Sequence, residues 1–236
     1  VLDTSFATGG ILTIDGSAGG EDDIGNAIYV DANHEVYVAG RADSVSNLAD
    51  MAVWKIASNG TPHSGGPLTH DSAAGGHAFD EATDLVKDAD GNLYVTGYSR
   101  NTDNNNDMVV WKVLATSDLS LDTSFATNGF FVFDISAVVG SSTNDTGEAI
   151  AIDENDDILV VGAGNGDAAA WRLSPDGVLD KSFNGDGVFF HDSAAGGFDS
   201  DVALDLFYDE DNELLYMTGY STNDNSDFDM AIWRLE

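Results

Sequence analysis

The residues of this chain that could do chemistry are its carboxylates, and the chemistry they favour is cation binding. The sequence has 42 acidic and 8 basic side chains, for a net charge of −34. Hard divalent cations such as calcium prefer several carboxylate, carbonyl and water oxygens as ligands. Eight aspartates recur in pairs along a fourfold pattern and are the candidate calcium ligands: Asp23 with Asp50, Asp80 with Asp107, Asp145 with Asp167, and Asp201 with Asp229.

These aspartates have an alternative role, which the sequence leaves open. Aspartate commonly caps backbone N–H groups in the loop that contains it, without any cation. If strands are numbered outward from a common axis, the connections that carry the eight aspartates fall on one face. The sequence therefore predicts an acidic rim, whether it binds calcium or caps its own loops.

A repeated hexapeptide positions the second aspartate of each pair. Its four copies contain all four tryptophans and span residues 50–55, 107–112, 167–172 and 229–234. Successive tryptophans are 57, 60 and 62 positions apart, which indicates four similar units. Three further stretches rich in β-branched and aromatic residues accompany each copy, as is typical of strands.

Four strands in each of four units predict an all-β fold: a four-bladed β-propeller with four antiparallel strands per blade. We expect a single domain over 1–236. Its blades are expected at about 22–72, 79–135, 144–193 and 200–236, the last completed by 9–16.

The outermost strand of the fourth unit does not follow that unit at the C-terminus. The matching sequence is at 10–15, so we expect this N-terminal strand to pair with the strand containing Trp233 and close the ring. Pairing within one chain is favoured by effective concentration. Exchange with a neighbouring molecule would satisfy the same hydrogen bonds and build a filament.

Three segments, 2–10, 121–129 and 179–187, share a Leu-Asp-x-Ser-Phe core and end in glycine. They resemble the signature of the delta-sixty β-propeller repeats, a largely uncharacterised and mostly extracellular family. The resemblance covers the whole chain and implies a propeller fold and a secreted protein. The segment 59–66 lacks the core and departs from the pattern.

Two further acids are candidate ligands at the propeller axis. Asp84 and Asp205 align with Ala27 and Ala149 of the alternate units, so the two carboxylates are expected to face one another in the central channel. Paired carboxylates can hold a cation or do acid–base work. No catalytic residue is expected, because no histidine, nucleophile or oxyanion motif accompanies them, and we favour a channel cation or ordered water.

The remaining polar motifs have simpler interpretations. Oxygen side chains alternate in turns such as Asp31 to Glu35, but the twelfth-position glutamate of an EF-hand is missing, so turn chemistry is favoured. His70 and His191 are expected at the surface. Asn59 and Asn144 begin glycosylation sequons that matter only in a secreted protein.

Composition narrows the function classes. So acidic a protein repels nucleic acid, and no apolar run is long enough to insert into a membrane. There is no cysteine, hence no disulfide framework. We expect a secreted, non-catalytic structural or adhesive module at the cell surface, stabilised by calcium and associating with itself, other surface proteins or glycans. The alternatives are a lectin-like module using Tyr98, Tyr220 and Phe228, and third a hydrolase or lyase.

Overall fold

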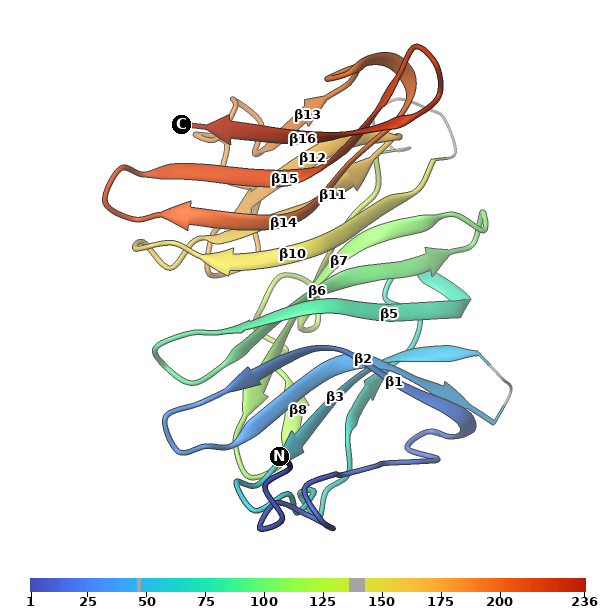
Figure 1. Cartoon of the computed structure of the whole chain (residues 1–236), viewed down its shortest axis with the longest axis vertical. Helices are drawn as coiled ribbons and strands as arrows, with labels where there is room; N and C mark the ends of the chain where they lie inside the picture. The colour runs from blue at the N-terminus through green and yellow to red at the C-terminus, as the bar shows by residue number, and fades with distance from the viewer. Residues whose placement is uncertain (46–47, 136–142) are drawn as a thin grey trace.

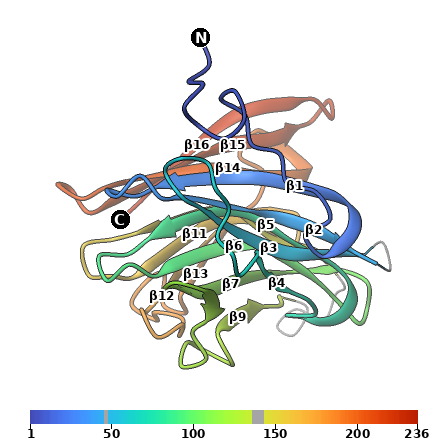
Figure 2. The same cartoon turned by 90° about the horizontal axis from the view of Figure 1, so that it is seen from below.

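The computed structural model describes residues 1–45, 48–135 and 143–236, and all regular secondary structure in them is β-strand. The strands form four antiparallel units stacked along the long axis of the molecule (Figure 1). The two termini lie at opposite ends of this axis. Figure 2 views the stack from the end that carries the N-terminus. The described residues include no helix suited to crossing a membrane.

The units follow chain order, and within each unit consecutive strands pair, except that β8 and β9 of unit two both pair with β7. Unit one contains β1 (Gly19–Val30), β2 (Val36–Ser44), β3 (Ala49–Ile56) and β4 (Leu68–His70). Unit two contains β5 (Gly75–Lys87), β6 (Leu93–Asn101), β7 (Asn106–Ala115), β8 (Leu119–Leu121) and β9 (Phe130–Phe133). Unit three contains β10 (Asp145–Ile152), β11 (Ile158–Gly164), β12 (Asp167–Leu173) and β13 (Val188–His191). Unit four contains β14 (Gly196–Asp209), β15 (Leu214–Asn223) and β16 (Phe228–Leu235).

The first strand of each unit is longer than the sequence predicts. Alternation alone supports only 27–31 in unit one, whereas β1 begins at Gly19. A shift in register between Gly25 and Ala27 lets the pairing continue, and the same shift occurs between Gly147 and Ala149 in unit three. Such bulges break the two-residue period, which is why a pattern search ends the strand too early.

Packing between neighbouring units forms the core. Trp111 on β7 is fully buried and packs with Met51 and Val53 of unit one and with Val95 of its own unit. Its indole N–H lies 3.3 Å from Nδ1 of His70 on β4. Trp111 therefore packs between units one and two.

The N-terminal strand differs from the expectation. Residues 12–15 are assigned to no strand, and the sheet of unit four consists of β14, β15 and β16 alone. Phe6, Leu12 and Ile14 pack instead on unit one, against Trp54. Because units one and four lie at opposite ends of the stack (Figure 1), the expected closure of the ring within one chain is not shown.

Replacing Trp111 tests the joint between units one and two. Trp111→Ala should lower the free energy of unfolding by about 3–5 kcal/mol, the range for truncating a large aromatic side chain in a core. Urea melts measure this loss. Val178→Ala, at a side chain 62% exposed, is the matched control. A loss below about 1 kcal/mol for Trp111→Ala would contradict the packing described.

Candidate metal centre

Three aspartates meet at the joint between units two and three. Asp107 is on β7, Asp134 follows β9, and Asp145 begins β10. One carboxylate oxygen from each lies within 4.8 Å of the other two. Asp107 and Asp145 are buried, with exposed fractions of 3% and 0%. Carboxylate oxygens so arranged are the ligands that hard divalent cations prefer, so this cluster could hold a metal ion.

The electrostatics of the cluster show why a cation fits. Burial raises the pKa of Asp107 to about 7, and repulsion from Asp134 adds to the effect, while a hydrogen bond from Asn101 opposes it. Burial also raises the pKa of Asp145 to about 6, against hydrogen bonds from the backbone N–H groups of Ile135 and Asn165. Buried carboxylates without a countercharge resist ionisation, and a bound cation would relieve that cost.

Loops from both units enclose the centre. Asn101 Oδ1 accepts hydrogen bonds from the N–H groups of Asp103 and Asn105, which shapes the loop before β7. Asn105 then donates to the carbonyl oxygen of Thr143 at 2.9 Å, and Asn106 N donates to Asn144 Oδ1 at 2.9 Å. Asn101 thus caps its own loop, and the same loop joins unit two to unit three beside the acids.

The structure groups the rim aspartates differently from the sequence analysis. Asp80 and Asp107 of one unit both pair with Ser99, one on each side of β6, so a strand separates them. The close partner of Asp107 is Asp145 of the following unit. Sequence spacing groups the acids by unit because it follows strand order, whereas the close contact of Asp107 with Asp145 joins two stacked sheets.

The sequence analysis missed Asp134. The signal was available, because an aspartate ends the outermost strand of every unit: Asp71, Asp134 and Asp192, with Asp15 in the N-terminal segment. This repeated aspartate, which lies outside the tryptophan hexapeptide, supplies the third carboxylate of the cluster.

The neighbouring joints repeat the arrangement in a more open form. Burial raises the pKa of Asp80 to about 6, with further repulsion from Asp71 and Asp50. Burial likewise raises the pKa of Asp167, with repulsion from Asp192 and Asp201. Among the described residues only the Asp107 cluster brings three such ligand atoms together within the same short distance.

Several rim carboxylates have an oxygen that is buried without a hydrogen-bond partner. These atoms are Oδ1 of Asp23, Asp80 and Asp201. The second oxygen of Asp80 accepts from Ser72 N at 2.9 Å, and that of Asp23 from Ser17 N at 3.0 Å. One oxygen of Asp80 and one of Asp23 thus perform the capping role expected as the alternative. The unpaired oxygens are the atoms available to a cation or water. Asp229, on the open edge of unit four, is exposed.

The two proposed channel acids have unequal surroundings. Asp84 Oδ2 accepts a hydrogen bond from Ile150 N in the next unit at 3.0 Å. Burial raises the pKa of Asp84, and repulsion from Asp205 adds to this effect. Asp205 itself is exposed. A third acid was overlooked: burial raises the pKa of Glu148, with repulsion from Glu81 across an open polar cleft.

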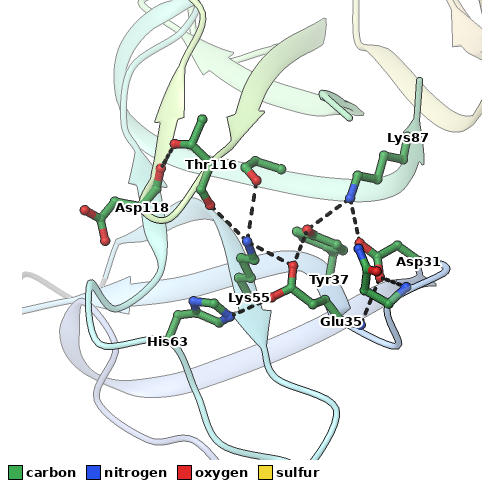
Figure 3. A network of polar contacts seen from close by, with 10 residues as sticks. Asp31, Glu35, Tyr37, Lys55, His63, Lys87, Thr116 and Asp118 are labelled. Atoms are coloured by element: carbon green, nitrogen blue, oxygen red, sulfur yellow. Dashed lines mark hydrogen bonds and ion pairs between the residues drawn. The ribbon is translucent and has the colours of Figure 1, made fainter. Parts of the chain in front are cut away.

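The opposite edge of the stack carries the lysine and arginine side chains that form ion pairs in the described part of the chain. Lys55 contacts Glu35 at 3.1 Å and the carbonyl oxygen of Thr116 at 2.9 Å, and Lys87 contacts Asp31 at 2.9 Å (Figure 3). The contact of Lys55 with Thr116 and that of Lys87 with Asp31 cross from unit one to unit two. Among the described residues, the lysine and arginine ion pairs therefore gather on this edge, and the rim pair is that of His77 with Asp71 at 3.2 Å.

The turns on this edge confirm the turn interpretation of their alternating oxygens. Asp31 Oδ1 accepts from the N–H groups of Asn33 and Glu35. Asp153 Oδ1 does the same for the corresponding residues of unit three. The first aspartate of each motif closes its own turn.

The two histidines are not the surface residues that the sequence suggested. His70 is half-buried, and its ring centroid lies 6.4 Å from that of Trp111 and 4.8 Å from that of Phe130. His191 packs against Trp233 in the same way, with centroids 6.3 Å apart. Both residues lie in the outermost strand of their unit, which suggested exposure. That strand is covered because it contacts the tryptophan of the next unit.

Both sequon asparagines are exposed. Asn59 Oδ1 accepts a hydrogen bond from Thr61 N, and Asn144 Oδ1 accepts from Asn106 N. Glycosylation at either position stays a prediction.

Comparison with family models relates the chain to propellers. Residues 89–125 and 155–183 match a β-propeller domain family of unknown function, DUF5122. Each matched segment ends at the phenylalanine of a Leu-Asp-x-Ser-Phe motif, Phe125 or Phe183, and both side chains are buried. The chain is thus an all-β protein with a propeller-like domain. None of the curated proteins matches it.

Among solved structures, the fold is similar to a gluconolactonase, XC5397 of Xanthomonas campestris. The alignment covers 88% of this chain and 58% of that enzyme, with 15% identity and a TM-score of 0.45. This chain therefore spans little more than half of the enzyme, and the likeness carries no conclusion about activity.

The raised pKa of Asp107 predicts a pH dependence of stability. Below the ordinary pKa of 3.8 the folded and unfolded states both hold the proton, and between 3.8 and about 7 only the folded state does. Stability should therefore fall as pH rises through this window when divalent cations are absent. Urea melts in chelator should show a steeper fall for the native protein than for Asp107→Asn. Parallel curves would indicate a solvated Asp107 carboxylate.

Proposed function

We propose that this chain is a secreted, non-catalytic structural or adhesive module of the cell surface. Its four units are the blades of a propeller, held together at their joints by calcium. The observation that carries the proposal is the buried cluster of Asp107, Asp134 and Asp145, which comes from two consecutive units. A cation bound there would link the units more strongly than it would stabilise either alone.

Calcium is the cation that suits this chemistry best. The cluster offers carboxylate oxygens, and the surrounding loop offers backbone carbonyl and amide oxygens, which together make a hard ligand set. Calcium sites of extracellular modules work at about 10⁻⁴–10⁻³ M, a range met outside cells. The net charge of −34 supports the same setting, because self-repulsion falls when cations bind.

A lectin-like function is the second candidate, and one observation favours it. Phe228 is 68% exposed and lies beside Tyr220, with ring centroids 4.7 Å apart. Exposed aromatic faces are suited to stacking against sugar rings. Tyr98 is less suited, since its hydroxyl donates to Glu81 at 2.8 Å. A glycan array with the native protein and Phe228→Ala would reveal such binding.

Added calcium should raise the melting temperature, because a ligand that binds only the folded state stabilises it by mass action. The measurement is calorimetry at constant ionic strength, since screening alone also stabilises so acidic a protein. Asp107→Asn should remove most of the response. Asp90→Asn, in an exposed turn, should keep it. Equal stabilisation by sodium and calcium at matched ionic strength would contradict the proposal.

A further inference from the structure

The C-terminal end of the stack exposes side chains that every internal joint buries. Met230 and Ile232 on β16 are 74% and 65% exposed. Their counterparts on β7, Met108 and Val110, are fully buried against unit three. The outward face of β16 therefore has the composition of a joint without the unit that would cover it.

The N-terminal end of the stack also exposes apolar side chains that an internal joint would bury. Ile28 on β1 is 68% exposed, whereas its counterpart on β10, Ile150, is 6% exposed against unit two. Beside Ile28 lies an apolar groove of about 300 Å³, lined by Leu12, Val38 and Trp54 among others. Side chains of a preceding unit would occupy this groove at an internal joint.

The N-terminal segment, residues 1–17, reproduces the outer part of a preceding unit. Ala7 N donates to the carbonyl oxygen of Asn59 at 2.8 Å, as Ala126 N donates to that of Asp176 at 2.8 Å. The segment thus docks on unit one as the corresponding part of unit two docks on unit three.

One more contact of the N-terminal segment repeats that of an internal joint, and another holds the segment to Trp54. Asp23 Oδ2 accepts from Ser17 N at 3.0 Å, where Asp145 Oδ2 accepts from Ile135 N at 2.8 Å. Ser17 Oγ accepts the indole N–H of Trp54 at 3.0 Å. The N-terminal segment therefore lies on unit one where the outermost strand of a preceding unit would lie. The three inner strands of such a unit are not present beside it in the described part of the chain.

Unit four has the opposite shortage. Its edge strand, β16, pairs with β15 on one side and with no strand of the described chain on the other. In unit two, Val109 of β7 pairs with Val132 of β9. By the same alignment Ala231 of β16 would pair with Thr13 of an N-terminal segment.

We propose that a second copy of this chain supplies the missing contact, head to tail. The N-terminal segment of one copy adds to β16 of the next, and the side chains of Met230 and Ile232 enter the groove of unit one. Two copies are required because the groove and β16 lie at opposite ends of the long axis (Figure 1). This inference deepens the structural role proposed above and rests on it for its purpose.

Charged groups at the two ends agree with this contact. In unit three, Arg172 lies 3.3 Å from Asp180, and the corresponding pair across the contact is Arg234 with Asp3. Asp229 of one copy would meet Asp15 and Asp23 of the other, in the arrangement of Asp107, Asp134 and Asp145. Asp23 Oδ1 is buried without a hydrogen-bond partner. This is expected of a ligand atom whose site is completed only by a second copy of the chain.

Disulfide trapping tests the contact on the full chain, which has no cysteine of its own. Lys112 N donates to the carbonyl oxygen of Gly129, so these two residues form a hydrogen-bonded pair of the antiparallel ladder. Hydrogen-bonded and non-hydrogen-bonded pairs alternate along such a ladder, and Val109 with Val132 lies three positions further on. It is therefore a non-hydrogen-bonded pair, whose Cβ atoms are close enough for a disulfide. Thr13→Cys and Ala231→Cys occupy the equivalent positions across the contact. The protein with Val109→Cys and Val132→Cys is the matched control, since these residues pair within one chain.

The two single variants are mixed and oxidised with calcium present. Head-to-tail association predicts a covalent species of twice the chain mass from the mixture, and a ladder of multiples from the double variant. A double variant that oxidises within single chains, with no product from the mixture, would overturn the proposal in favour of ring closure. Absence of any Thr13–Ala231 bond, while the control pair oxidises, would also overturn it. If calcium does not raise the melting temperature, the cation role is refuted. The head-to-tail contact detected by the disulfide bonds would be unaffected.

Discussion

Every joint between units depends on a tryptophan of the third strand packing against the outer strand of the unit before it. Trp111 contacts His70, Trp171 contacts Phe133, and Trp233 contacts His191. The hydrophobic effect supplies the driving force, and the large flat ring fixes the separation of the sheets. The arrangement extends to the first unit, where Trp54 meets the N-terminal segment in place of a strand. One interaction, repeated, thus determines where the acids of consecutive units come together.

The sequence predicts the strands well, but it predicts less well which residues of neighbouring units come into contact. The spacing of Trp54 and Trp111 reports the repeat, and β-branched stretches report the strands, because both signals are local. The contact of Asp107 with Asp145 is not local, since it depends on how two stacked sheets are offset. The tryptophan partner of His70 was missed for the same reason. Asp134 is the exception: its repeated position was visible, but no local rule distinguished it from an ordinary strand end.

The two edges of the stack use charge in opposite ways. On the turn edge, Lys87 and Arg172 neutralise Asp31 and Asp153, which close their turns, and Lys55 neutralises Glu35. On the rim, within the described part of the chain, neither Asp107 nor Asp145 forms an ion pair with lysine or arginine. With only eight basic side chains, the protein places several of them on the turn edge. Under the calcium role proposed above, the stability of the rim depends on cations from the surroundings, whereas that of the turn edge does not.

The placement of the termini at opposite ends of the stack has a mechanical consequence (Figure 1). A pulling force applied between the two ends passes through the joints in series, so the weakest joint sets the load at which the molecule yields. The joint between units one and two is fastened by Lys55 and Lys87, which the protein carries itself. The joint between units two and three gathers three carboxylates instead. Under the calcium role proposed above, the resistance of this joint to tension varies with the divalent cation concentration around the molecule, and so does the load that the whole chain can bear.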